Sequence, residues 1–240
     1  MYSETDGVPD GTDLVLLHGG IGTGRYHWSK QVEPLGKRFR LHLPDLPGHG
    51  HEPVPEGREY SRELLAEAVE ELLEEIGPPV HVAAFSMGGH ACLALAQERP
   101  DLFASLTLVG VSIRDHPGLK GWRDSFDPDL LQQRYPVWAR ALRKLHAPLG
   151  EEAWREVCDR DRGGLDVAVD LDRLARLRCP VLLVRGDRDP AVDPSHYAEL
   201  RAVWEQADEM VVPAGGHEVQ LTRAALVAPA LLDFLERAGA

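Results

Sequence analysis

The sequence predicts an α/β fold: a mostly parallel central sheet with helices on both faces. Two observations support this fold class. Short runs that are apolar at nearly every position alternate with amphipathic helical segments along the chain, and strands of this kind are typical of a sheet buried on both faces. Residues 114–176, in contrast, contain helical patches but no convincing strand. We therefore expect a sheet-containing core interrupted by one helical insertion.

The expected strands are apolar runs that end in glycine, proline or polar residues. They are LVLLHGG (14–20), the start of RLHLPDLPGHG (40–50), VHVAAF (80–85), SLTLVGVS (105–112), CPVLLVRGD (179–187) and EMVVPAGGH (209–217). Such strands predict that the carboxyl ends lie together at one edge of the sheet, where parallel-sheet proteins place their sites.

Helices are expected between these strands. Residues 61–76 carry apolar side chains at helical spacing, with Ser61 as N-cap and Gly77 as the stop. Further helices are predicted after Ser86, ending before Pro100, and over 194–207 and 223–237.

The insertion divides the chain into a core, residues 1–113 and 177–240, and a helical cap, residues 114–176. The cap is rich in aromatic residues, which are expected either to line a substrate pocket or to form the interior of the cap. They are Trp122, Phe126, Tyr135, Trp138 and Trp154.

Composition limits the partners of this protein. Its 26 basic and 39 acidic residues give a net charge of −13, which repels phosphate backbones and anionic lipids. No apolar run approaches the about 20 residues of a membrane helix, and the polar N-terminus does not resemble a signal peptide. The three cysteines have no metal-binding spacing. We expect a cytoplasmic protein with reduced thiols and no nucleic-acid or membrane partner; composition does not predict the oligomeric state.

Ser86, in AAFSMGGHA (83–91), follows a predicted strand and precedes a predicted helix. It is either a nucleophile on a sharp strand-to-helix turn or a polar residue in a glycine turn that caps the helix. A serine hydroxyl needs a base, and the base needs a third group to orient it. The rest of the chain offers both.

The base candidate is His217, which follows the last strand in PAGGHEV. The acid candidates are Asp187, Asp189 and Asp193 in RGDRDPAVD, with Asp115 as a weaker one. Asp193 precedes a proline and a helix and is better explained as an N-cap. We favour Asp189.

Oxyanion donors are expected from the backbone N–H of Met87, at a helix start, and of Gly20, in HGG (18–20). His18 is expected to brace this loop. The segment HGGIGTG (18–24) could also be a phosphate loop, but it lacks the Lys-Ser/Thr ending of that motif.

Taken together, the motifs LLHGG, LPDLPGHG, AFSMGG, VLLVRGDRDP and PAGGH resemble the α/β-hydrolase fold family in order and spacing. The resemblance covers nearly the whole chain outside the cap. It implies Ser86 as nucleophile, Asp189 as acid, His217 as base, and Gly20 and Met87 as oxyanion donors. It implies no metal and no cofactor.

The sequence departs from the family pattern at three places. Ala84 replaces the usual first glycine of the elbow, and His51 stands where a serine is common. Only 13 residues precede Leu14, whereas family members usually begin with a pair of antiparallel strands. We therefore expect the first strand to be missing or reduced to a stub and the sheet to have seven strands or fewer.

The leading functional hypothesis is a serine hydrolase that cleaves a carboxylic ester or thioester of a small molecule with an apolar acyl part. FSMGGHACLAL also resembles the pyruvate-eliminating lyase of the menaquinone pathway. A carbon–carbon bond hydrolase is a third possibility, and a non-catalytic small-molecule receptor of the same fold is a fourth. An anionic substrate would require arginines at the site, and the cap offers Arg114, Arg123, Arg134, Arg140 and Arg143.

Overall fold

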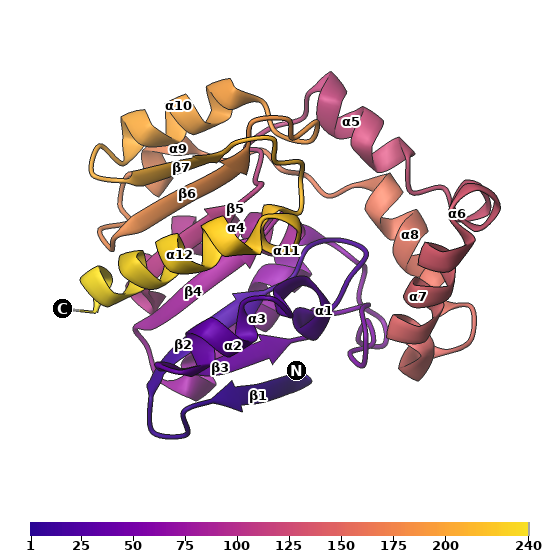
Figure 1. Cartoon of the computed structure of the whole chain (residues 1–240), viewed down its shortest axis with the longest axis horizontal. Coiled ribbons are helices and arrows are strands. Elements are labelled where there is room, and N and C mark those ends of the chain that lie inside the picture. Colours follow the sequence, from indigo (N-terminus) through magenta and orange to yellow (C-terminus); the bar gives the residue numbers. More distant parts are fainter. Residues whose placement is uncertain (240) are drawn as a thin grey trace.

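The computed structural model describes residues 1–239, in which a twisted sheet lies between two layers of helices (Figure 1). Within these residues the sheet has seven strands in the order β1-β3-β2-β4-β5-β6-β7. The strands are β1 (Ser3–Gly7), β2 (Thr12–Leu17), β3 (Phe39–Pro44), β4 (Val80–Phe85), β5 (Phe103–Val109), β6 (Val181–Gly186) and β7 (Asp208–Val212). Strand β1 is antiparallel to β3, and the other neighbours are parallel. The predicted fold class is confirmed.

One strand precedes β2, and the seven-stranded sheet is within the expected limit. Strand β1 is neither missing nor a stub, because it has five residues, as many as β7. Strand β1 pairs with β3 from Ser3 opposite Pro44 to Gly7 opposite Arg40, and it forms one edge of the sheet. Gly7 has φ 86°, and a Cβ atom there would stand 2.3 Å from the Phe39 carbonyl oxygen. The chain can therefore turn this close to β3 only because residue 7 is glycine.

The two faces of the sheet are buried by different helices. On β2, Val15 and Leu17 point to one face, while Leu14 and Leu16 point to the other, as the period of two in a strand requires. The first face is covered by α3 (Arg62–Ile76), α4 (Met87–Glu98), α9 (Leu171–Leu174) and α10 (Pro194–Val203). The second is covered by α1 (Gly24–Trp28), α2 (Val32–Gly36) and α12 (Ala224–Ala238), with α11 (Val219–Thr222) joining it.

Helix α3 begins and ends where its sequence predicts. The Ser61 hydroxyl accepts a hydrogen bond from the Leu64 N–H, which satisfies one donor of the first turn. Gly77 ends the helix with φ 105°, a conformation that favours glycine.

Between β5 and β6 the chain forms a separate helical group at the carboxyl ends of the parallel strands (Figure 1). It consists of α5 (Pro117–Asp124), α6 (Pro128–Arg134), α7 (Pro136–His146) and α8 (Ala153–Gly163). Proline occupies the first position of three of these helices, where its missing N–H has no intrahelical role. The group has its own apolar cluster, to which the core contributes Ile21. Helix α9 instead packs on the main core through Leu174.

His51 has a clear structural role. Its backbone N–H and its Nδ1 each lie 3.0 Å from Asp45 Oδ2, and its ring stacks on Tyr2 with centroids 4.2 Å apart. Asp45 Oδ1 also accepts a hydrogen bond from the Gly24 N–H at 3.2 Å. The imidazole thus joins the turn after β3 to the residues that begin β1.

Candidate active site

Ser86 lies in the turn between β4 and α4, at the carboxyl end of the sheet. Its φ is 49° and its ψ is −112°, a strained conformation for a residue other than glycine. The Ser86 N–H donates to the Val109 carbonyl at 2.9 Å, and the Ser86 carbonyl accepts from the His90 N–H at 3.1 Å. These backbone bonds hold the turn so that the hydroxyl points out of the sheet edge.

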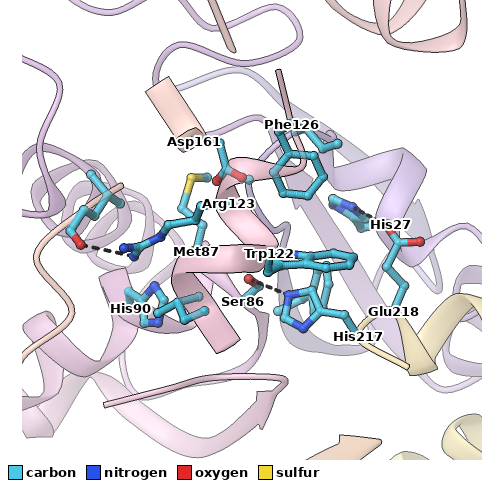
Figure 2. Close-up of a pocket in the computed structure, with 15 residues that line it drawn as sticks. His27, Ser86, Met87, His90, Trp122, Arg123, Phe126, Asp161, His217 and Glu218 are labelled. Carbon is cyan, nitrogen blue, oxygen red and sulfur yellow. Dashed lines mark hydrogen bonds and ion pairs between the residues drawn. The ribbon is translucent and has the colours of Figure 1, made fainter. Parts of the chain in front are cut away.

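The Ser86 hydroxyl lies against His217 (Figure 2). The other side of the His217 ring lies against Asp189. Ser86 Oγ is 2.9 Å from His217 Nε2, and His217 Nδ1 is 2.9 and 3.1 Å from the two Asp189 oxygens. An ionised carboxylate can only accept, so Nδ1 carries the proton and Nε2 is free to accept the serine proton. The structure therefore brings together the three residues that the sequence singled out.

The other carboxylates considered for the acid contact different groups. Asp187 accepts from the Gly215 N–H at 3.1 Å and holds the loop that leads to His217. Asp193 caps α10 by accepting from the Ser195 N–H at 2.9 Å. Asp115 forms an ion pair with Arg123 at 3.0 Å. Of the four candidates, only Asp189 contacts the imidazole of His217.

The expected oxyanion donors lie beside this serine. The N–H groups of Gly20 and Met87 donate to no other group in residues 1–239, and both residues line the cavity around Ser86. The Gly88 N–H donates to the His18 carbonyl at 3.0 Å, which joins the start of α4 to the loop after β2. Both N–H groups are thus available to a negatively charged oxygen.

Two buried histidines hold the loop that carries Gly20. His18 Nδ1 donates to the Gly19 carbonyl at 2.7 Å, and His18 Nε2 accepts from the Leu46 N–H at 2.8 Å. His27 Nδ1 accepts from the Gly19 N–H at 3.2 Å, while its Nε2 lies 3.6 Å from Glu218. His18 therefore braces the loop, and His27 does the same from α1.

The contact between Gly88 and this loop gives a testable prediction. A Cβ atom on Gly88 would stand 2.7 Å from the His18 carbonyl oxygen and 2.8 Å from the Leu17 Cβ. We expect Gly88→Ala to lower the free energy of unfolding by about 1–3 kcal/mol through overpacking and to reduce kcat by displacing the Gly20 loop. Thermal unfolding and ester hydrolysis measure the two effects.

Gly121→Ala is the matched control, because it adds the same methyl group on helix α5 where nothing lies within 4 Å. Alanine favours helix, so this variant should be as stable as the wild type or slightly more stable. An unchanged melting temperature in Gly88→Ala would contradict the close contact.

The cavity above Ser86 is lined mainly by apolar side chains. They include Ile21, Phe85, Leu119, Trp122 and Phe126. The Trp122 ring lies edge-on to the His217 ring, with centroids 5.1 Å apart, and also contacts Phe126. Two of the five aromatic residues expected in a pocket therefore lie there.

The structure corrects the pocket expectation for the other three aromatic residues. Trp154 is fully buried inside the helical group, with the guanidinium groups of Arg143 and Arg155 over its ring. Tyr135 is 59% exposed and packs beside Trp138. Both line a neighbouring hollow rather than the Ser86 cavity. Helical spacing predicts that these apolar side chains are buried on one side of their helices. It does not predict which neighbouring residues each of them contacts.

Four polar residues of the cavity were not foreseen: His27, His90, Asp161 and Glu218. Arg123, one of the arginines considered for an anionic substrate, lines the cavity as well. Asp161 stands in DRDR (159–162), a charge pattern that also fits a solvent-exposed helix face. Arg123 donates to the Leu165 carbonyl at 3.2 Å and to Asp115 at 3.0 Å. Sequence spacing alone carried no signal that would have separated these residues from surface charges.

Four buried histidines near the site remain neutral at working pH. Burial lowers the pKa of His18 and His90 to about 3 and lowers that of His49 and His146 below the ordinary value. His146 joins α7 to two core loops: its Nε2 donates to the Ile21 carbonyl at 3.1 Å, and its Nδ1 accepts from the Gly50 N–H at 3.0 Å. Protonation of His146 Nδ1 would turn it into a donor that faces the Gly50 N–H, which is also a donor.

Acid should therefore destabilise the fold. Below the ordinary histidine pKa of about 6.5 the unfolded chain binds protons that the folded chain excludes, so stability is full above that pH and falls below it. Each histidine contributes a slope of up to about 1.4 kcal/mol per pH unit. Asp161 has the opposite effect on stability: burial raises its pKa to about 6, so protonating it in acid stabilises the fold. The four histidines together outweigh this single carboxylate. Urea unfolding at pH 7.5 and 5.0 tests this; equal stabilities would contradict it.

Residues 1–239 contain no group of three His, Cys, Asp or Glu side chains placed to hold a metal ion, and no helix among them is long and apolar enough to cross a membrane. All three cysteines, Cys92, Cys158 and Cys179, are free thiols.

Comparison with known proteins decides the family. A family model described as the Alpha/beta hydrolase family matches residues 14–230. The chain belongs to the alpha/beta hydrolase family. A curated relative of this alpha/beta hydrolase, the pimeloyl-[acyl-carrier protein] methyl ester esterase of Aeromonas salmonicida (strain A449), is 32% identical over 229 residues, covering 86% of this chain and 89% of that protein.

Other relatives of this alpha/beta hydrolase carry different names. A putative carbamate hydrolase, RutD, of Caulobacter sp. (strain K31) is 27% identical, covering 98% of this chain and 95% of that protein. Among solved structures, a thermophilic esterase from Thermogutta terrifontis has a TM-score of 0.77 at 23% identity, covering 99% of this chain and 93% of that one. These structures share the fold of this alpha/beta hydrolase.

Proposed function

We propose that this alpha/beta hydrolase is a serine esterase that cleaves a carboxylic ester through an acyl-enzyme, with Ser86 as nucleophile, His217 as base and Asp189 as its orienting acid. The observation that carries the proposal is the pair of hydrogen bonds, each 2.9 Å, that join Ser86 Oγ to His217 and His217 to Asp189. The proposed reaction needs no metal and no cofactor.

In the first step His217 Nε2 takes the proton of Ser86 as Oγ attacks the ester carbonyl carbon. The carbonyl oxygen becomes negative and is bound by the N–H groups of Gly20 and Met87. The imidazolium is stabilised by Asp189 and returns the proton to the leaving alcohol. A water molecule, activated by the same imidazole, then hydrolyses the acyl-enzyme.

For the substrate, we propose a small-molecule ester with an apolar acyl part, and with a small alcohol such as methanol as leaving group. The relatives named as methyl ester esterases support this leaving group. Leu119, Trp122 and Phe126 support the acyl preference, because they put apolar surface beside the serine. The proposed compartment is the cytoplasm, which the three free thiols support.

We further propose the division into a core of residues 1–113 and 177–240 and a cap of residues 114–176. Helices α5–α8 would be the part of the cap that faces the substrate, since α5 and α8 supply Trp122 and Asp161 to the cavity, while α9 packs on the core.

Arginine placement weighs against an anionic substrate, and so against the lyase alternative. Of the cap arginines at 114, 123, 134, 140 and 143, Arg123 alone lines the Ser86 cavity within residues 1–239. Its guanidinium already contacts Asp115 and the Leu165 carbonyl.

The proposal is tested with methyl esters of graded acyl length and the matching acyl thioesters, hydrolysed by the wild type and by Ser86→Ala. We expect turnover of methyl esters by the wild type, and labelling of Ser86 by a fluorophosphonate that Ser86→Ala abolishes. Labelling without turnover of any ester or thioester would overturn the esterase proposal and favour a receptor or a different reaction at the same serine.

A further inference from the structure

Asp161 reaches from helix α8 into the cavity above Ser86 (Figure 2). Its carboxylate lies against Gly20, the proposed oxyanion donor: a Cβ atom on residue 20 would stand 2.0 Å from Asp161 Oδ1 and 2.5 Å from Cγ. Glycine at position 20 therefore makes the room that the carboxylate fills. Asp161 and Ser86 thus line the same cavity.

This carboxylate has no hydrogen-bond donor within residues 1–239. Burial raises its pKa to about 6, and the positive charge of Arg123 offsets this only in part. The Arg123 guanidinium is held by other partners, Asp115 and the Leu165 carbonyl. Asp161 is partly exposed, and at neutral pH its carboxylate is mainly ionised. A ligand that supplies a positive charge and hydrogen-bond donors would therefore be favoured beside it.

A buried side-chain nitrogen without a hydrogen-bond partner lines the same cavity. His90 is 6% exposed, and its Nε2 has no hydrogen-bond partner within residues 1–239. Burial lowers the pKa of His90 to about 3, so the ring is neutral. In the tautomer that carries its proton on Nδ1, Nε2 is an acceptor. Apart from the oxyanion amides, the cavity thus offers unsatisfied acceptors to a ligand.

We propose that Asp161 is a specificity residue that binds a primary ammonium group on the acyl part of the ester. The inference rests on the ester hydrolysis proposed above and narrows its substrate class. An ammonium group supplies both the positive charge and the hydrogen-bond donors that the Asp161 carboxylate lacks. The same carboxylate would repel an acyl chain that ends in a free carboxylate.

Matched pairs of methyl esters test this. Glycine, β-alanine and 4-aminobutyrate methyl esters are compared with their uncharged isosteres, methyl propanoate, butanoate and pentanoate. The wild type should prefer the ammonium ester at one of these lengths by about 10- to 100-fold in kcat/KM, the range of a charge-assisted hydrogen bond. Asp161→Asn should remove that preference. Asp159→Asn is the matched control, because it makes the same change on α8 at a side chain that is 59% exposed and paired with Arg162.

The pH dependence of the preference gives a readout that does not require a variant. The ratio of the two kcat/KM values should fall as the pH is lowered through about 6, where Asp161 becomes protonated. The groups that face Asp161 are Arg123, Tyr60, His217 and, on its own helix, Cys158. Burial raises the pKa values of Tyr60 and Cys158, so they stay neutral, and Arg123 stays charged. His217 is the proposed base for both esters, so its role in hydrolysis is common to the two kcat/KM values.

The outcomes separate this inference from the proposed function. Hydrolysis of the uncharged esters with no preference for any ammonium ester in the wild type would overturn the role of Asp161 and leave the esterase intact. A preference that persists in Asp161→Asn, or that does not change between pH 7.5 and 5, would also overturn it. Failure to hydrolyse any of the six esters would overturn the proposed function itself.

Discussion

Replacing Ser86 or His217 by alanine should lower kcat by about 10⁶. The residues of a catalytic triad act as one unit, so removing either one abolishes the activated nucleophile. Asp189→Asn should lower kcat by about 10⁴, since asparagine can donate to Nδ1 and favours the wrong imidazole tautomer. Steady-state hydrolysis of a methyl ester measures all three variants, and circular dichroism verifies that each is folded.

Asp193→Asn is the control for the acid. Asp193 lies four residues from Asp189 in the same loop, but its carboxylate caps α10. Asparagine is also a good N-cap, so activity should stay within a few-fold of the wild type. If Asp189→Asn is nearly silent while Asp115→Asn or Asp187→Asn is inactive, the assignment of Asp189 is wrong.

Two cap tryptophans should behave oppositely when replaced by alanine. Trp154 is fully buried in the interior of the helical group, so Trp154→Ala should lower the free energy of unfolding by about 3–5 kcal/mol. Trp122 is partly exposed and lines the Ser86 cavity. Trp122→Ala should instead alter selectivity, because a substrate gains about 0.8 kcal/mol for each methylene that it buries.

The measurement is kcat/KM over a series of acyl lengths, together with thermal unfolding. For Trp122→Ala we expect a greater loss on long acyl chains than on acetate, with a small change in melting temperature. Trp138→Ala is the control, because Trp138 lines a neighbouring hollow and not the Ser86 cavity. This variant should leave the chain-length dependence unchanged. Equal losses on short and long chains in Trp122→Ala would show that its ring supports the catalytic groups rather than the acyl chain.

The sequence determined the sheet and the residues at its edge because both depend on local patterns. The apolar run at 80–85 forms β4 with the predicted bounds. Ser61 and Gly77 stand at the two ends of α3, as predicted. Once the strands are parallel, Ser86, Asp189 and His217 must all lie at their carboxyl ends. The choice of Asp189 over its neighbours could be favoured from the sequence, since Asp193 has a capping signature.

Only the tertiary structure decided which side chains of the helical group face Ser86. Asp159 and Asp161 are two residues apart in one charged run, yet Asp159 is exposed and Asp161 enters the cavity. In the sequence, Trp122 and Trp154 are both aromatic residues of predicted helical patches. In the structure, Trp122 contacts His217, whereas Trp154 lies in the interior of the helical group. The physical reason lies in the difference between strands and helices. In a strand, successive side chains point to opposite faces of the sheet, so the sequence alone tells which residues share a face. The helices α5–α8 pack on one another and on Ile21, and only that packing sets which side of each helix meets the cavity.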